Sequence, residues 1–314
     1  MHRRLISVVA MLLACCSASA QNAVFDSYIK SAEKSSEKGD IAGAEKFLLL
    51  AEKEAEGDVA KLVNVWHRLA LTKDRLFKYA DAEAHYKKAL AAVERRNKGK
   101  KEDRNWLAHS QTLYANQLRM RGRYDEAEAL YKKALAIREK VNGAKAWETA
   151  QLMRDLADNH RDAGRYDAAE PIYRSAIATL DGMKGREYHL AFCLANLGES
   201  MLLQDKVDEA EALAQQGMDI YRKHKIVAQQ NRAFCLATLG EAQARLKKVA
   251  EAQKTFAEGL REMEISGPAS IRMVPLLKRA GKFYRDNGRI AEAAKLEESA
   301  KAIEEKHAKA NAET

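Results

Sequence analysis

One motif recurs along most of the chain and constrains its fold more than any other feature. The residues Gly-Arg-Tyr-Asp-Glu-Ala at 122–127 return as Gly-Arg-Tyr-Asp-Ala-Ala at 164–169. The third place of this motif can be followed along the chain, and its last five intervals are 45, 42, 41, 42 and 41 residues. That place is held by Ile41, Tyr79, Tyr124, Tyr166, Val207, Val249 and Ile290. A nearly fixed period of this length indicates a repeat architecture in which each unit packs on its neighbours.

Within a repeat the apolar residues are spaced as on an α-helix. Leu113 and Leu118 precede Gly122, and Leu130 follows it. Because apolar residues a few positions apart share one face of a helix, the pattern predicts two helices per repeat, with the glycine between them. We expect the ring of Tyr124 to be buried between the two helices.

The turn between the helices is expected at the glycine of the motif. Gly122, Gly164 and Gly288 stand two residues before the third place. Glycine enters the left-handed region without strain, and this is a common way for a helix to end. Asp205 and Lys247 stand at the same place in two other repeats, so the turn is less clearly specified there.

The run Gly-Arg-Tyr-Asp-Glu-Ala-Glu-Ala-Leu-Tyr-Lys-Lys-Ala-Leu at 122–135 resembles the tetratricopeptide repeat, and the period resembles the longer repeats of kinesin light chains and their bacterial relatives. The resemblance covers about residues 24–305, is strongest at 106–180 and is weaker at 24–57 and 270–305. It implies an all-α, right-handed superhelical solenoid of antiparallel helix pairs, with about seven repeats. It also implies that the first helices line a concave groove that binds peptides or protein segments. Period and spacing alone predict only the helix pairs.

The first twenty residues differ from the rest of the chain. A basic run at 2–4 precedes an apolar run at 5–14, and small residues at 18–20 suit a cleavage site. This is the layout of a secretory signal peptide, so we expect a single solenoid domain at 21–314, exported to the periplasm or secreted. Cys15 ends a run that resembles the lipobox of bacterial lipoproteins, and its acylation is the alternative.

The charge of the chain bears on its partners. Removal of the first twenty residues lowers the formal charge from +9 to +7, since that segment holds two arginines and no acidic residue. A basic chain favours acidic protein segments, anionic lipid surfaces or polyanionic cell-wall polymers, and export makes nucleic acid an unfavoured partner. No later stretch reaches the roughly 20 apolar residues of a transmembrane helix, so membrane anchoring is expected only through an acylated Cys15.

The candidate partner-binding residues are basic and periodic. Arg119, Arg161 and Arg285 each stand three residues before a turn glycine, and Arg75 stands three residues before Lys78. If these arginines face the groove they form a row, and their planar guanidinium groups suit carboxylates. The candidate set is completed by Asn116, Arg154, Asn196 and Lys282.

Carboxylates on the same helices leave a second interpretation open. They are Asp155, Asp158, Asp162, Glu199 and Glu241. If these groups pair with the arginines, the helices present an ordinary mixed-charge surface.

Signals for catalysis or metal binding are missing from the sequence. It contains no His-x-x-x-His or Cys-x-x-Cys spacing, no phosphate-binding Gly-rich loop and no Gly-x-Ser-x-Gly elbow, so we expect no enzyme, no cofactor and no metal. Cys193 and Cys235 lie 42 residues apart in adjacent repeats. Neighbouring helices lie about 8–10 Å apart and a disulfide needs Cα atoms within about 7 Å, so we expect two small buried residues.

These observations favour a non-enzymatic scaffold that binds a peptide or protein segment in its groove. Two alternatives stay open. One is an envelope assembly factor or lipoprotein that bridges membrane or cell-wall components. The other is an enzyme or carrier whose site no motif reveals.

Overall fold

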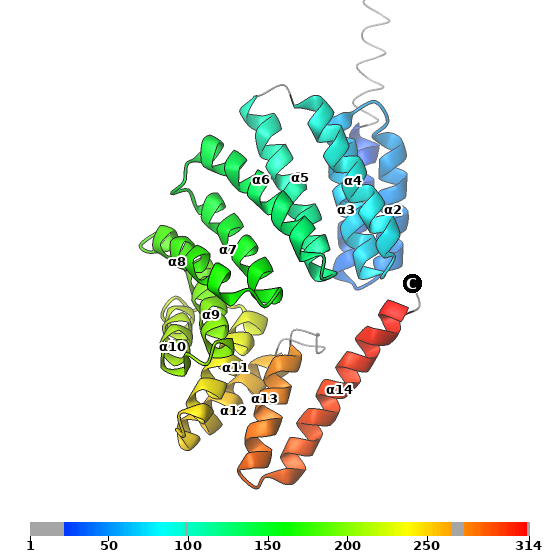
Figure 1. The fold of residues 1–314 in the computed structure, drawn as a ribbon. Helices are drawn as coiled ribbons and strands as arrows, with labels where there is room; N and C mark the ends of the chain where they lie inside the picture. The colour runs from blue at the N-terminus through cyan, green and yellow to red at the C-terminus, as the bar shows by residue number, and fades with distance from the viewer. Residues whose placement is uncertain (1–21, 98–99, 266–272, 313–314) are drawn as a thin grey trace, which may run out of the picture. The chain divides into compact units, whose positions relative to one another are not determined.

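The computed structural model describes residues 22–97, 100–265 and 273–312, and the regular structure in these ranges is helical throughout. Successive helices pack as antiparallel pairs, about seven in all, so the all-α solenoid expected from the repeats is confirmed (Figure 1). The signal-peptide segment and Cys15 lie outside the described residues.

The chain divides into two compact units, and the boundary between Tyr114 and Ala115 falls inside α5. In the first unit α3 packs between α2 and α4. Its helices are one at residues 22–37, then α2 (Ile41–Glu54), α3 (Val59–Arg75), α4 (Tyr79–Arg96) and the larger part of α5 (Lys101–Met120).

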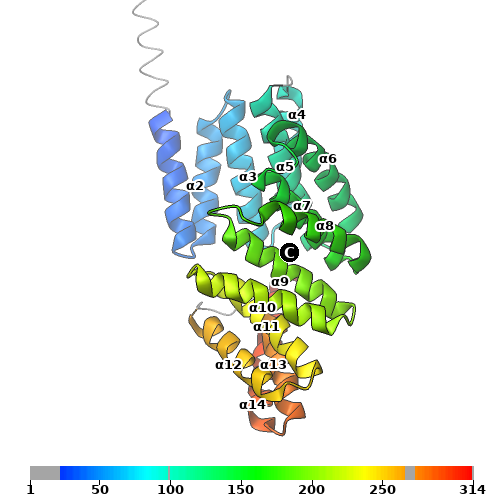
Figure 2. The same ribbon diagram turned by 90° about the vertical axis from the view of Figure 1, so that its left-hand side faces the viewer.

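The second unit begins with the end of α5 and is also built of antiparallel helix pairs. Here α9 packs against α8, α10 and α11, and α11 packs against α12 and α13 (Figure 2). Its remaining helices are α6 (Tyr124–Asn142), α7 (Trp147–Asp162), α8 (Tyr166–Leu180), α9 (Glu187–Leu203), α10 (Val207–Lys223), α11 (Gln229–Arg245), α12 (Val249–Ile265), α13 (Val274–Asp286) and α14 (Ile290–Ala312).

The core lies between the first and second helices of the pairs, where small residues let the backbones approach. A Cβ added to Gly198 of α9 would meet the carbonyl oxygen of Ala210 at 3.3 Å. A Cβ added to Gly240 of α11 would lie 2.9 Å from the Phe256 ring. The most enclosed helix is α9, in which every residue from Cys193 to Leu202 is buried.

In the repeats with the tyrosine motif, the buried aromatic residue is not the one that the sequence suggested. Tyr124, at the start of α6, is only half-buried, whereas Tyr131 lies seven residues later and is fully buried. Tyr86 and Tyr173 hold the same place in α4 and α8 and are also buried. The third place of the motif is the first residue of the second helix, and its side chain is only partly covered. The tyrosine seven positions later, in the middle of that helix, is buried.

The turns between paired helices share one backbone conformation whether or not glycine is present. Gly122 and Gly164 have φ of +71° and +73°, as expected. Phe77, Asp205 and Lys247 take φ of +60° or +61° at the equivalent positions. A non-glycine residue is strained in this region, so packing of the two helices imposes the turn on these three residues.

The two cysteines of the described residues are free and fully buried, as expected. Cys235 Sγ lies 3.2 Å from the carbonyl oxygen of Ala214, and burial raises the pKa of both thiols to about 12. Among the described helices, none has the length and apolar character that a membrane crossing requires.

Candidate functional site

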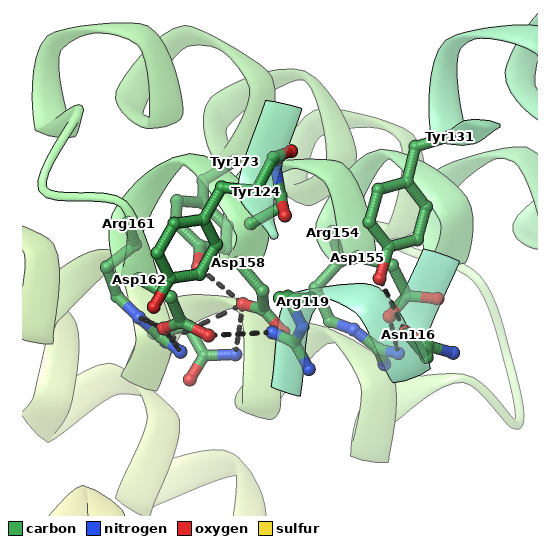
Figure 3. Close-up of polar contacts among 12 residues, drawn as sticks. Asn116, Arg119, Tyr124, Tyr131, Arg154, Asp155, Asp158, Arg161, Asp162 and Tyr173 are labelled. Atoms are coloured by element: carbon green, nitrogen blue, oxygen red, sulfur yellow. Dashed lines mark hydrogen bonds and ion pairs between the residues drawn. The ribbon is translucent and has the colours of Figure 1, made fainter. Parts of the chain in front are cut away.

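The candidate site is a buried set of polar side chains in the second unit, which we call the polar network (Figure 3). Its charged members on α7 are spaced so that they fall on one face of that helix, the face turned toward α5 and α9. The network comprises Asn116, Arg119, Tyr131, Arg154, Asp155, Asp158, Arg161, Asp162, Tyr173 and Asn196.

Asp158 is the centre of the network and is 5% exposed. Its carboxylate accepts hydrogen bonds from the Tyr173 hydroxyl and, at 3.1 Å, from the Asn196 amide. The guanidinium nitrogens of Arg119 and Arg161 lie 3.5 Å and 3.6 Å from its oxygens. One carboxylate therefore joins side chains from α5, α7, α8 and α9.

Asp162 supplies a second carboxylate to the same two arginines. Arg119 Nη1 lies 3.2 Å from Asp162 Oδ2, and Arg161 Nη2 lies 2.8 Å from Oδ1. The arginine side chains are 18% and 16% exposed. Burial by itself would lower the pKa of Arg119, but the nearby carboxylates raise that pKa above its usual value, so both guanidinium groups stay charged.

Arg154 and Asp155 form a separate ion pair of the network. Arg154 Nη2 lies 2.5 Å from Asp155 Oδ1, and its guanidinium carbon lies 5.2 Å from the centre of the Phe192 ring. Burial raises the pKa of Asp155 in spite of the adjacent arginine. Tyr131 donates a hydrogen bond of 2.6 Å to Asn116, which completes the network on the α5 side.

Three donors of the network have no hydrogen-bond acceptor in the described residues. They are the buried Nε atoms of Arg119 and Arg154 and the buried Nη1 atom of Arg161. The network contains three arginines and three aspartates, so the formal charges of these six side chains sum to zero. Because the three donors are buried, an incoming oxygen can accept from them only when the side chains that cover them move aside.

An ion pair outside the polar network, between Arg279 of α13 and Glu199 of α9, was missed by the sequence reasoning. Two nitrogens of Arg279 lie 2.8 Å and 2.6 Å from the two oxygens of Glu199. Arg279 stands eleven residues before Ile290, as Asp155 and Asn196 stand eleven before the third place of their own repeats. A comparison of that position across the repeats would have found it.

The expected row of four equivalent arginines does not form. The residue with the left-handed turn is Phe77, so Asp74 is the counterpart of Arg119 and the placement of Arg75 was wrong by one position. Arg75 is exposed in the first unit. Arg285 has the expected register, but its side chain pairs with Glu297 of α14 at 3.0 Å.

The other candidates divide between buried and exposed positions. Arg119, Arg161, Arg154, Asn116 and Asn196 come together in the network, whereas Lys282 is exposed on α13. Carboxylates pair with the three arginines of the network, but these pairs are largely buried and do not form an exposed mixed-charge surface. Among the residues that the structure describes, no group of three or more His, Cys, Asp or Glu side chains could hold a metal ion.

Comparisons with known proteins agree with the repeat architecture. Models of the tetratricopeptide repeat match residues 63–92, 106–181 and 191–224. No curated protein matches the chain.

Solved structures with the same fold have low sequence identity. BtubC (BKLC) from P. vanneervenii is 18% identical, with a TM-score of 0.59 over 80% of this chain and 94% of that one. Aspartyl phosphate phosphatase F from Bacillus subtilis is 13% identical, with a TM-score of 0.70 over 96% of this chain and 75% of that one. A Rap protein complexed with Competence and Sporulation Factor is 12% identical, with a TM-score of 0.60 over 91% of this chain and 76% of that one. These likenesses concern the fold.

Proposed function

Because this chain is a tetratricopeptide repeat protein, we propose that it is a non-enzymatic scaffold that binds a peptide or protein segment along the first helices of its second unit. The Rap protein complexed with Competence and Sporulation Factor supports the proposal, since a protein of similar fold is there found in a complex. The residues that would contact the segment are the arginines and asparagines of the polar network.

The observation that carries the proposal is the burial of charge in the network. Arg119, Arg154 and Arg161 are at most 18% exposed and are matched by three aspartates. A buried ion pair is often no more stabilising than apolar residues of the same volume, and its replacement can stabilise a protein by roughly 1–4 kcal/mol. Stability alone therefore gives no reason for six charged side chains here, whereas recognition of a polar segment does.

The chemistry of the segment follows from the donors that remain. The Nε groups of Arg119 and Arg154 lack acceptors in the described residues, and the formal charge of the chain without residues 1–20 is +7. A segment that brings carbonyl and carboxylate oxygens would satisfy these donors. We therefore expect an acidic or acid-flanked segment.

The test is selection of binding segments from a displayed peptide library with the full-length chain. The variant Arg154→Gln/Asp155→Asn removes one ion pair without leaving a lone buried charge. The control, Arg174→Gln/Glu170→Gln, removes the 2.9 Å ion pair on α8 and the pairs of these residues with Glu209 and Lys206, all outside the network. Segments enriched by wild type and control but weakened about tenfold or more in the network variant, a change of about 1.4 kcal/mol, would support the proposal. Equal binding by all three proteins would exclude the network, and a wild type that enriches no segment would refute the scaffold role.

We also propose that the chain is exported, on the basis of the layout of residues 1–20. Mass spectrometry of the chain from its native host distinguishes the routes. Cleavage after Ala20 supports export as a free protein, and a chain that begins at a lipid-bearing Cys15 supports the envelope lipoprotein alternative. A chain that keeps residues 1–20 refutes both.

A further inference from the structure

The ion pair between Arg279 and Glu199 connects helices that are not neighbours in the array. Arg279 lies on α13 and Glu199 on α9, and both helices pack against α11. Thr238 of α11 lies beneath the pair and donates a hydrogen bond of 2.8 Å to Glu199 Oε2. We call Glu199, Thr238 and Arg279 the clasp.

The clasp is unusual for a repeat array, because contacts in such arrays normally join only adjacent repeats. Its two charged residues are 80 positions apart, and their side chains are 17% and 11% exposed. Burial would raise the pKa of Glu199, but Arg279 and Thr238 lower that pKa below its usual value. The clasp is therefore an ionised, two-pronged pair that holds the first of three successive helix pairs to the third.

The surface of α13 next to the clasp carries two lysines, and Glu241 of α11 is also near enough to interact with Arg279. Lys282 lies one helical turn beyond Arg279 and is exposed, and Lys278 precedes Arg279 and pairs with Glu304 of α14 at 2.7 Å. Residues three apart on a helix share a face, so Arg279 and Lys282 can contact the same ligand. Glu199 is then the carboxylate that occupies a basic site made by α13.

We propose that Glu199 acts as an internal competitor in the free protein, and that a carboxylate of an acidic partner segment replaces it on Arg279 while Lys282 binds a second acidic group. This inference rests on the proposed function, since it names the partner chemistry and the regulation of the same scaffold. The exchange keeps the two-pronged geometry of Arg279, because one carboxylate leaves as another arrives. The freed Glu199 keeps its hydrogen bond from Thr238.

Competition by Glu199 has a measurable consequence. Only the fraction of molecules in which Arg279 is released can bind, so the apparent affinity falls by that fraction. Glu199→Gln keeps the size of the side chain and an acceptor for Thr238, but it removes the charge that holds Arg279. This variant should therefore bind an acidic ligand more tightly than wild type.

The experiment measures binding of a fluorescent hexaglutamate peptide to the full-length chain by anisotropy, with hexalysine as the charge control. We expect Glu199→Gln to bind hexaglutamate about tenfold more tightly than wild type, as removal of a largely closed state allows. Lys282→Gln, which is exposed and outside the clasp, should weaken binding in the Glu199→Gln background. Adding Arg279→Gln to Glu199→Gln should abolish the gain.

The outcomes separate this inference from the proposed function. If Glu199→Gln binds hexaglutamate no more tightly than wild type, the clasp does not compete and the inference is overturned. That result does not affect the proposed function, which is tested separately by the library selection with the polar-network variant. If Arg279→Gln in the Glu199→Gln background retains the gain, with helicity unchanged by circular dichroism, the basic site lies elsewhere and the inference is also overturned.

Discussion

Replacement of Asp158 by alanine removes the group on which the polar network depends. Arg119 and Arg161 are less than one fifth exposed, and each would lose a carboxylate at 3.5 Å or 3.6 Å. Breaking a buried ion pair by removal of one partner costs roughly 3–5 kcal/mol. The Tyr173 hydroxyl would lose its acceptor as well, which adds about 1–3 kcal/mol when no replacement is found.

Asp162 moderates this loss, because it stays within 3.2 Å of Arg119 and 2.8 Å of Arg161. We therefore expect Asp158→Ala to lower the free energy of unfolding by about 3 kcal/mol, the lower end for a broken buried pair. Asp158→Asn keeps an acceptor for Tyr173 and should cost about 1–2 kcal/mol, mainly through the lost charge.

Urea titration followed by far-ultraviolet circular dichroism at pH 7 measures these losses, with the slope of the transition compared between variants. The matched control is Asp162→Ala, since Asp162 is 33% exposed and serves the same arginines. An exposed pair contributes about 1 kcal/mol or less, so the control should lose much less than Asp158→Ala. A loss below 1 kcal/mol for Asp158→Ala, or an equal loss for both variants, would refute the central role of Asp158.

Three further outcomes are expected. Tyr131→Ala, which empties a fully buried site, should cost about 3–5 kcal/mol, whereas Tyr124→Ala should cost clearly less in the same titration because that ring is half-buried. Lys247→Gly should raise the free energy of unfolding by up to about 1 kcal/mol, because φ of +61° strains lysine and not glycine; a loss of stability would show that the lysine side chain is needed there. Burial, with a smaller effect of His109, lowers the pKa of His67 from 6.5 to about 4, so between these values the unfolded chain binds a proton that the folded chain does not. The contribution of neutral His67 to the free energy of unfolding is complete above pH 6.5 and falls by roughly 3 kcal/mol as the pH drops to 4. In urea titrations at several pH values, the free energy of unfolding of His67→Gln should therefore fall by roughly 3 kcal/mol less than that of wild type over this range.

The repeat period predicted the helix pairs well because it reports a physical requirement that every repeat shares. The left-handed turn is one such requirement, and it persists at Asp205 and Lys247 where glycine is missing. Tyr124 shows where the pattern was insufficient. A recurring aromatic residue marks a contact, but how far that contact is covered depends on neighbouring repeats.

The candidate site was predicted only in part. Which carboxylate a long charged side chain pairs with depends on the helices that pack around it, and the sequence pattern does not give that packing. Arg161 and Arg285 hold equivalent positions, yet Arg161 turns to Asp162 and Arg285 turns to Glu297 of the last helix. Arg75 was misplaced because a phenylalanine takes the left-handed turn and hides the register. Arg279 escaped notice because its partner is 80 residues away.

The enclosure of α9 affects how the second unit comes apart. Linear arrays commonly fray from their ends, since each terminal repeat is held by a single neighbour. Every residue from Cys193 to Leu202 is covered, and Arg279 of the last helix pair reaches Glu199 inside that stretch. Loss of α13 and α14 by truncation would therefore uncover a buried carboxylate two repeats inward. The last helix pair thus stabilises a helix two repeats away from it. Proteolysis within α13 or α14 should release the last three helix pairs together.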